Sequence, residues 1–468
     1  MRRIRPSRRV YTAIRLGAAI ATMCLSGGAF AETVVLDHFT LIDGTGRAPV
    51  ADQALVMTNG RITWVGPSRR RPAAAKSATT EDLRGKYLMP GIIDSHVHLG
   101  LVNGVDQNFT KYYDRANIEA QLRLYAAYGV TSVYTLGTDG DTIHDVIADQ
   151  RRIGRVEMAR AYTAGRGVVF KGSYGGVPGL DQSVATPAEA TAMVERETAK
   201  GDDFVKLWMD DEFGTVAERM PYPVSTAVIA AAHKADKRAA AHIFYYDNAA
   251  ELTREGVDVF MHQVRDRVAD APLIAAMKAR GTWQLASTLS REASFTYTLL
   301  PFVDDPFFSR GVAPSTVATL KSDERQQRLA ASPTFPKYPQ VLTNAMASFA
   351  AEAKAGVKYG MGTDSGPTAR FPGYFAHWEM ELMVKAGVTP LQAITAATGT
   401  NASFLGSNEA GTVQKGKWAD LLVLDRDPVA DIRNTRAISS VYIAGRKVPT
   451  IWQTCVGRAA DACGAAKP

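Results

Sequence analysis

The chain has 468 residues, of which 46% are hydrophobic and 22% charged, and its formal net charge is +7 at pH 7. This length is enough to bury a large core and supports one large domain with a smaller one. Six arginines and no lysine or acidic residue lie in residues 1–31, so the rest of the chain carries a net charge of only +1. The basic balance therefore gives no reason to expect a nucleic-acid partner.

Residues 1–31 are predicted to be a signal peptide. Their arginines precede a short apolar stretch, Leu16–Leu25, and Ala29-Phe30-Ala31 is a typical cleavage site. The apolar stretch is too short for a membrane span. Ser7–Tyr11 partly resembles a twin-arginine signal, so the Sec and Tat routes are both open, with an uncleaved anchor as the alternative. We expect an exported protein, periplasmic or secreted, with no membrane span in its mature form.

Two β-rich segments flank the middle of the chain. Residues 32–86 alternate apolar and polar positions, and Asn59-Gly60 between two apolar runs indicates a hairpin. A comparable pattern returns in residues 407–450. We predict that the two segments pair into one small composite β-sandwich, followed by a tail at 451–468.

The middle, residues 87–406, repeats a unit in which a helical segment ends in Gly and a short apolar strand follows. The helices are predicted at 117–129, 187–201, 223–237, 247–255, 270–280 and 340–355. Eight strands that alternate with helices indicate an α/β fold, a (β/α)8 TIM-like barrel. An open doubly wound sheet is the alternative, but no GxGxxG turn follows the first strand.

Two long connections interrupt this repeat. Residues 166–183 are rich in Gly and predict a flexible loop after the third strand. Residues 290–337 are rich in aromatic residues and Pro. Long loops in a compact domain commonly serve as lids or binding loops, so both are candidates to shape a substrate site.

Polar side chains lie at the ends of the predicted strands. Because the carboxyl ends of barrel strands meet at one face, we expect these side chains to converge there. They are His96, His98, Lys206, His242, His262 and Asp364. The remaining histidines fall in the small domain or on helices, and we interpret them as structural: His38, His144, His233 and His377.

This set of residues resembles the ligand set of the amidohydrolase superfamily of metal-dependent hydrolases. The motifs that carry the resemblance are PGIIDSHVH, FVKLW, AAHIF, VFMHQ, MGTDSG and KWADLLVLD. Within that superfamily the chain looks most like the imidazolonepropionase-related branch, which includes Xaa-Pro dipeptidases and ochratoxin-type amidases. The resemblance covers nearly all of residues 32–468 and implies the split β-sandwich and the barrel.

The resemblance implies a binuclear metal centre. His96 and His98 would bind the more buried ion together with Asp364, and His242 and His262 would bind the second. Two divalent ions, expected to be zinc, are the implied cofactors. A mononuclear site is the alternative, and it would still support an enzyme.

Lys206 would be carboxylated and would bridge the two ions, as the resemblance implies. An ammonium group has no lone pair, so Lys206 can serve as a ligand only if it is neutral and modified. Burial beside two cations favours loss of its proton. The alternative is a core lysine paired with Asp210 or Asp211.

These ligands predict a hydrolase in which a metal-activated hydroxide attacks a small-molecule substrate at an amide or peptide-like C–N bond. A dipeptide, an N-acyl amino acid and a cyclic amide are the substrate classes in view. Asp364 would take the proton and pass it to the leaving amine. A lactonase or phosphoesterase on the same site is one alternative, and a non-catalytic binding protein is another. The sequence leaves open whether the chain forms a homo-oligomer.

Residues for substrate binding are predicted next to these ligands. Tyr245 and Tyr246 follow His242, although tyrosines there are as often packing residues, and Trp208 lines either the pocket or the barrel interior. Arg166 and Lys171, in the loop after strand 3, are candidates to bind a carboxylate of the substrate. The alternative is that both are solvent-exposed loop residues without a role in binding.

Cys455 and Cys463 are the cysteines left once residues 1–31 are removed. In an exported protein an even pair predicts a disulfide, with two free thiols as the alternative. A disulfide here would close a short loop and add on the order of 2.5 kcal/mol on the chain-entropy estimate.

Overall fold

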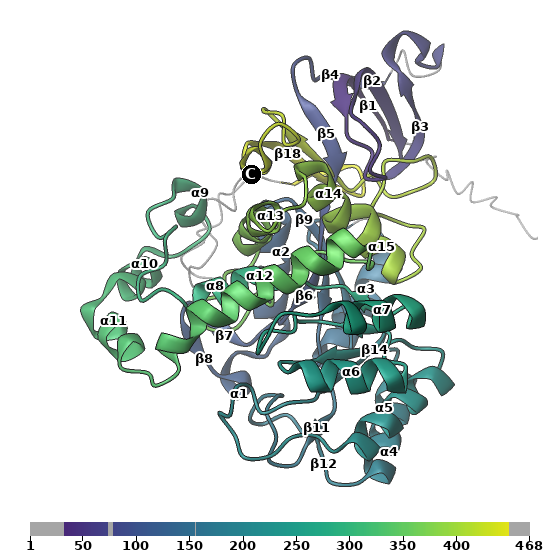
Figure 1. Ribbon diagram of the computed structural model, residues 1–468. Coiled ribbons are helices and arrows are strands. Elements are labelled where there is room, and N and C mark those ends of the chain that lie inside the picture. The colour runs from purple at the N-terminus through teal and green to yellow at the C-terminus, as the bar shows by residue number, and fades with distance from the viewer. Residues whose placement is uncertain (1–31, 74–77, 155, 449–468) are drawn as a thin grey trace, which may run out of the picture. The chain divides into compact units, whose positions relative to one another are not determined.

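The computed structural model describes residues 32–73, 78–154 and 156–448 (Figure 1). The predicted signal peptide and the Cys455–Cys463 disulfide lie outside these residues. Among the described residues, no helix combines the length and the apolar content needed to cross a lipid bilayer.

One mixed sheet joins the two ends of the described chain, as the purple and yellow-green strands of Figure 1 show. Its strand order is β19-β18-β17-β5-β1-β2-β3, and β4 pairs with β1. The turn at Asn59-Gly60 connects β2 to β3, which confirms the predicted hairpin. The strands are β1 (Thr33–Leu41), β2 (Val50–Thr58), β3 (Arg61–Pro67), β4 (Thr79–Asp82), β5 (Tyr87–Pro90), β17 (Leu421–Leu424), β18 (Ile438–Ile443) and β19 (Arg446–Lys447).

Parallel strands form two further sheets, with orders β10-β9-β6 and β13-β14-β15-β16. They are short and buried because helices cover their faces. The first sheet contains β6 (Ile92–Val97), β9 (Val130–Thr135) and β10 (Arg160–Thr163). The second contains β13 (Val205–Trp208), β14 (Ala239–His242), β15 (Val259–Phe260) and β16 (Trp283–Gln284).

Isolated parallel bridges connect these sheets. Val168 pairs with Leu207 of β13, Gln284 of β16 pairs with Tyr359, and Ser365 pairs with Val97 of β6. The segment predicted as a strand at 357–365 does not form a regular strand, although its backbone hydrogen-bonds to β16 and to β6 and the residues that follow them. Gly residues weaken a strand, and the backbone of Asp364 is left-handed, with φ of 56°.

Helices follow the strands, and most predicted helices are confirmed. They are α2 (Arg115–Ala127), α3 (Thr142–Ile153), α4 (Pro187–Ala199), α5 (Tyr222–Lys234), α6 (Tyr246–Glu255), α7 (Ala271–Arg280), α12 (Tyr338–Ala355), α13 (Tyr374–Lys385), α14 (Pro390–Thr395), a π-turn (Ala396–Thr400) and α15 (Asn401–Phe404). Gly256, Gly281 and Gly356 end α6, α7 and α12 in the left-handed conformation, as expected for a C-terminal cap. In α2, Ile118, Leu122 and Tyr125 lie one helical turn apart and bury one face in the core.

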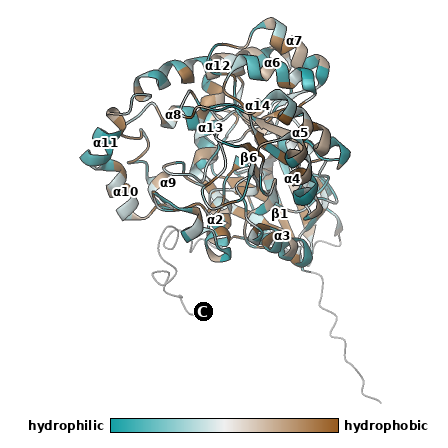
Figure 2. Cartoon of the chain, turned by 90° about the horizontal axis from the view of Figure 1, so that it is seen from below, coloured by the Kyte–Doolittle hydropathy of each residue, from teal (hydrophilic) through white to brown (hydrophobic). Residues whose placement is uncertain are grey.

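The two long connections carry more structure than expected. The flexible loop predicted at 166–183 is braced by the pairing of β11 (Val169–Phe170) with β12 (Ser183–Val184). Residues 290–337, expected to be a loop, hold short helices, of which α9, α10 and α11 begin at proline or after a capping Asp or Ser. These are α8 (Leu289–Ser294), α9 (Pro306–Ser309), α10 (Pro314–Lys321), α11 (Asp323–Ala330) and a 3-10 turn (Phe335–Lys337). Figure 2 shows α11 as mainly hydrophilic, in keeping with a surface helix.

Short elements complete the described chain. They are a 3-10 turn (Ser68–Arg70), β7 (Val102–Asn103), β8 (Asp106–Gln107), α1 (Phe109–Tyr112) and a 3-10 turn (Ile432–Arg436).

A buried ion pair joins the parallel strands to the mixed sheet. Arg160 of β10 donates from Nε to Asp420 Oδ2 at 2.9 Å, and Asp420 Oδ1 accepts from the backbone N–H of Ala444 at 2.6 Å. Removing one partner of a buried pair leaves the other charge uncompensated, which costs about 3–5 kcal/mol. We expect Asp420→Ala to lower the free energy of unfolding by this amount in chemical denaturation.

The exposed pair Arg84–Asp82 provides the control. Its side chains are 71% and 51% exposed, and its atoms lie 3.0 Å apart. Asp82→Ala should change the free energy of unfolding by less than about 1 kcal/mol. Equal losses in the two variants would contradict the structural importance of Asp420.

Candidate metal centre

The six residues predicted as ligands lie where strands end, and all are buried. His96 and Lys206 are within β6 and β13, and His242 is the last residue of β14. His98 directly follows β6, and His262 lies two residues after the end of β15. Asp364 lies in the segment that pairs with β6 through Ser365. The segments that carry these side chains are neighbours through backbone pairing.

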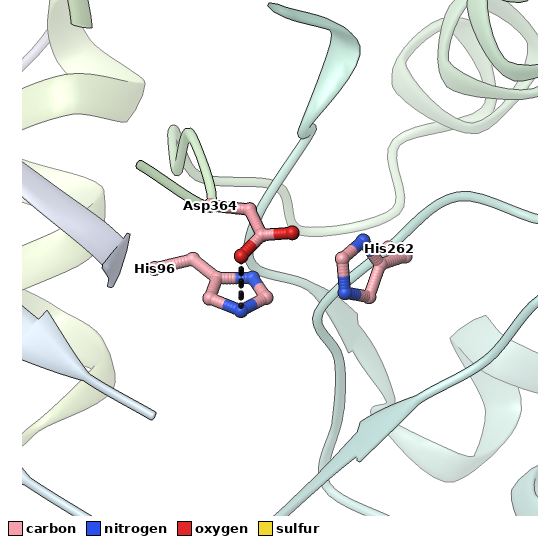
Figure 3. Close-up of side chains that lie close together, drawn as sticks. All are labelled: His96, His262 and Asp364. Carbon is pink, nitrogen blue, oxygen red and sulfur yellow. Dashed lines mark ion pairs between the residues drawn. The ribbon is translucent and has the colours of Figure 1, made fainter. Parts of the chain in front are cut away.

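His96, His262 and Asp364 form the first group able to hold a cation, because their ligand atoms lie within 4.8 Å of one another (Figure 3). Asp364 Oδ1 lies 3.7 Å from His96 Nε2 and 2.9 Å from His98 Nε2. Donors of a tetrahedral zinc site with bonds of 2.0–2.2 Å are about 3.3–3.6 Å apart. The observed spacings lie close to this range, so these donors fit a divalent ion.

The other ring nitrogens of these histidines are bonded away from the group. His96 Nδ1 donates to the carbonyl oxygen of Met261 at 3.0 Å, which leaves Nε2 unprotonated. That Nε2 is buried and has no hydrogen-bond partner among the described residues. His98 Nδ1 lies 2.8 Å from Thr138 Oγ1, and His262 Nδ1 lies 3.2 Å from Thr288 Oγ1. Such outer contacts fix the orientation of metal-binding imidazoles.

His242 belongs to a second group, with Asp210 and Glu212. The rings of His242 and His262 are 4.1 Å apart between centroids, so the two groups are adjacent. Burial lowers the pKa of His242 to about 3. Burial, and then the charge of Lys206, hold the pKa of His96 well below its usual value. The imidazoles are therefore neutral at pH 7, as metal ligands must be.

Lys206 is fully buried, and among the described residues its Nζ has no hydrogen-bond partner. Asp211, one of its expected partners, pairs instead with Arg219 at 2.7 Å. Burial lowers the pKa of Lys206 to about 7. Gly137 leaves room for its stem, because a Cβ there would lie 2.9 Å from Lys206 Cγ. The amine is thus available for modification at neutral pH.

A buried charge cluster surrounds the predicted ligands, and most of it was missed by the sequence analysis. Glu212 pairs with Arg265 and Arg291, and Arg291 also lies 2.9 Å from Asp364. We use the name "charge cluster" for Lys206, Asp210, Glu212, Arg265, Arg291, Glu292, Asp364 and Arg370.

The arginines keep two carboxylates of the cluster, Asp364 and Glu212, ionised. Burial opposes the ionisation of Asp364, but Arg370 and the neighbouring histidines outweigh it and hold its pKa well below the usual value. Burial likewise opposes the ionisation of Glu212, and the charges of Arg291 and Arg265 reverse the effect. No motif marked these arginines, because charged residues in predicted loops are usually solvated.

The predicted substrate-binding tyrosines differ in their surroundings. The Tyr245 hydroxyl donates to Asp211 Oδ1 at 2.7 Å, next to the second group, and the Arg219 guanidinium covers its ring. The Tyr246 hydroxyl donates to Asp270 on the exposed side of α6. Of the two, Tyr245 is the one that the structure brings close to the ligands.

The other substrate-binding candidates also differ in whether they lie close to the predicted ligands. Arg166 pairs with Asp141 at 3.2 Å and with Glu197 at 3.6 Å, and Lys171 is exposed. Trp208 is buried beside Lys206, whose Nζ lies 5.0 Å from the centre of its ring. Of the loop after strand 3, Gly167 packs close to Lys206, because a Cβ there would lie 3.1 Å from Lys206 Cβ, while Arg166 pairs with acidic residues outside the predicted ligand set.

The Amidohydrolase family model matches residues 87–448. The chain belongs to the amidohydrolase family. This membership places it among hydrolases that act on carbon–nitrogen bonds, and it gives the chain a TIM-barrel-like α/β fold. The family generally uses divalent metal ions, and the described residues contain the two groups that could hold them.

Relatives confirm the branch inferred from the motifs. An imidazolonepropionase from Aromatoleum aromaticum is 33% identical over 124 residues, which cover 26% of this chain and 29% of that protein. An ochratoxinase from Aspergillus niger is 24% identical over 460 residues, covering 89% of this chain and 86% of that protein. Among solved structures, a Xaa-Pro dipeptidase with bound methionine has a TM-score of 0.68 at 20% identity and covers 89% of this chain and 99% of its own. Molinate hydrolase has a TM-score of 0.68 at 21% identity, with coverages of 90% and 95%.

The contact between Thr138 and His98 supplies a test of the first group. Thr138→Val removes the hydroxyl that orients the imidazole but keeps the shape of the side chain. Loss of such an outer contact typically costs 10–100-fold in metal affinity. We expect a loss of about this size for one ion in competition with a chromophoric chelator.

Thr138→Ser retains the hydroxyl and should bind this ion almost as tightly as the unmodified chain. If Thr138→Val bound metal as tightly as Thr138→Ser, the hydroxyl would have no part in orienting His98.

Proposed function

We propose that the chain is an exported, metal-dependent amidohydrolase that cleaves an amide or peptide-like C–N bond in a small molecule. The observation that carries this proposal is the approach of Asp364 Oδ1 to His96 Nε2 at 3.7 Å and to His98 Nε2 at 2.9 Å, in a buried site of an amidohydrolase-family chain. Export rests on the signal-like organisation of residues 1–31.

In this proposal His96, His98 and Asp364 would hold one ion, and His242 and His262 would hold the second. His262 lies between the two positions, because its ligand atom groups with those of His96 and Asp364 while its ring lies 4.1 Å from that of His242. Zinc is the expected metal because imidazole and carboxylate donors suit it. When bound, such ions acidify a water molecule and polarise the scissile carbonyl group.

Lys206 is proposed to carry the carbamate that bridges the two ions. Its buried Nζ without a hydrogen-bond partner and its pKa of about 7 support the modification, because carboxylation requires a neutral amine.

Asp364 is proposed to accept the proton released during attack and to return it to the leaving amine. Its Oδ1 faces His96 and His98, whereas Oδ2 pairs with Arg291 and Arg370. Oδ1 is thus directed toward the proposed metal ligands, while Oδ2 is fixed by the two arginines. The left-handed backbone at Asp364 supports the same interpretation, because strained conformations often occur at functional sites.

The finer architecture is also part of the proposal. The two parallel sheets and the bridges at Val168, Tyr359 and Ser365 support a closed (β/α)8 barrel over residues 87–406. The mixed sheet, built from both ends of the described chain, supports a composite small β domain over 32–86 and 407–450.

The substrate class follows from the relatives with printed activities, an ochratoxinase and a Xaa-Pro dipeptidase. We propose a dipeptide, an N-acyl amino acid or a cyclic amide. The deciding assay offers N-acyl amino acids, dipeptides ending in proline, lactones and a phosphotriester, each with and without a chelator. Chelator-sensitive hydrolysis of amides alone supports the proposal. Hydrolysis of lactones or of the phosphotriester alone would replace the amidohydrolase proposal with a lactonase or a phosphoesterase. No hydrolysis of any substrate would indicate a binding protein.

Asp364→Asn keeps the size of the side chain and removes its ability to accept a proton as a carboxylate. We expect at least about a hundredfold loss of kcat, the scale of general-base contributions. The circular dichroism spectrum and most of the bound metal should be retained. Activity close to that of the unmodified chain would exclude Asp364 as the base.

Carboxylation of Lys206 should depend on pH with a defined sign. Below about pH 7 the amine is protonated and cannot react with CO2, so the carbamate fraction should rise as pH increases through 7. The metal-free chain incubated with isotopically labelled bicarbonate, followed by NMR detection of the carbamate, measures this fraction. The Lys206→Met variant is the control, and an equal signal from both chains would exclude Lys206 as the modified residue.

A further inference from the structure

The second group of ligand-type side chains lies just beyond the ends of two neighbouring strands. His242 ends β14, and Asp210 and Glu212 follow β13. His242 Nε2 lies 3.0 Å from Glu212 Oε2 and 3.6 Å from Asp210 Oδ2. The first spacing is about 0.3 Å below the roughly 3.3–3.6 Å expected between donors of a tetrahedral ion, and the second is at its upper limit.

Asp210 is the unexplained member of this group. Its side chain is fully buried, and Oδ1 accepts the backbone N–H of Glu212 at 2.7 Å. Oδ2 is buried and has no hydrogen-bond partner among the described residues. Leaving a buried carboxylate oxygen unpaired is costly, so a site of this kind calls for a cation.

No neighbouring cationic side chain in the described part of the chain donates a hydrogen bond to this oxygen. Arg219 pairs with Asp211, and Arg265 and Arg291 pair with Glu212. The Nζ of Lys206 makes no hydrogen bond to any described residue. None of these four groups donates a hydrogen bond to Asp210 Oδ2.

Glu212 is fixed beside this oxygen. Oε1 pairs with Arg291, and Oε2 faces both Arg265 at 3.1 Å and His242. Oε2 is within hydrogen-bond distance of Arg265 Nη2 and of His242 Nε2. A carboxylate oxygen has two lone pairs, so Oε2 can accept from Arg265 and also bind a cation once His242 Nε2 is unprotonated and itself a ligand. The two arginines thus orient the carboxylate without using all its acceptor capacity.

We propose that His242, Asp210 and Glu212 together bind the second divalent ion of this chain, so that its retention does not require a carbamate on Lys206. This inference rests on the proposed function for the existence of a second ion, and it adds two carboxylate ligands to the set implied by the family resemblance. One imidazole and two carboxylates suit Zn²⁺ or Mn²⁺.

The test is a metal titration of the metal-free chain with Co²⁺, followed by visible absorption and by metal content after dialysis. Absorption of Co²⁺ responds to the ligands around the ion, so it reports on the second site independently of activity. The unmodified chain should bind two ions. Asp210→Asn and Glu212→Gln should each bind the first ion normally and the second at least about tenfold more weakly, the lower limit for loss of a supporting contact.

Two matched variants separate coordination from loss of charge. Asp211→Asn neutralises the carboxylate next to Asp210, and Glu292→Gln neutralises another partner of Arg265 and Arg291. Both should bind two ions as the unmodified chain does. If Glu292→Gln weakened the second ion as much as Glu212→Gln, the arginine network rather than coordination would explain the loss, and Glu212 would be removed from the ligand set.

The role of Lys206 is tested with Lys206→Met and with the unmodified chain in CO2-depleted buffer. The second ion should be retained in both, and its loss in both would overturn the proposal in favour of an essential carbamate. Two ions bound equally well by Asp210→Asn, Glu212→Gln and the unmodified chain would also overturn it, while leaving the proposed function intact. If the unmodified chain bound no ion at all, the proposed function itself would fail.

Discussion

The need to compensate buried charge governs the catalytic end of the parallel strands. An isolated ion in a protein interior is expensive, and it persists only when opposite charges and hydrogen bonds surround it. Glu212 meets this need through Arg265, Arg291 and His242, and Asp364 through Arg291 and Arg370. These contacts keep Glu212 and Asp364 ionised, and burial keeps the neighbouring imidazoles neutral, which is the protonation state that metal ligands require.

Distant parts of the chain hold this cluster together. Glu379 of α13 accepts the backbone N–H groups of Leu289 and Ser290 at 2.8 and 2.7 Å, at the N-terminus of α8. A carboxylate at a helix N-terminus is favourable because it satisfies free N–H groups. This contact fixes α8, which carries Arg291 into the cluster between Glu212 and Asp364. The segment 290–337 thus serves the site through Arg291, whatever its effect on substrate choice.

The sequence predicts the repeating units because their signals are local. Helix caps such as Gly256 and the hairpin at Asn59-Gly60 depend on a few adjacent residues, and both are confirmed. The end of each strand also predicts His96 and Asp364 as neighbours, since parallel strands align their carboxyl ends. The partners of Glu212 could not be predicted from local signals. Arg291 is 79 residues away from it, and only the folded chain brings the two together. Residues 357–365 are also not predictable from local signals: their sequence is typical of a strand, but their backbone does not form a regular one.

The balance of charge links the state of Lys206 to the number of ions. In the charge cluster, four carboxylates face three guanidinium groups and one amine, so a charged lysine makes it neutral. One divalent ion adds two positive charges, and loss of the lysine proton together with a bound hydroxide removes two. A second ion adds two more, which a carbamate offsets only in part. At the second position Asp210 supplies a buried carboxylate oxygen, Oδ2, that has no hydrogen-bond partner among the described residues. Burial raises the pKa of Asp210 to about 7, and a divalent ion beside it would favour its ionised form. This unpaired carboxylate oxygen is therefore the feature that lets the second ion bind while Lys206 is unmodified, with the carbamate adjusting the charge rather than creating the site.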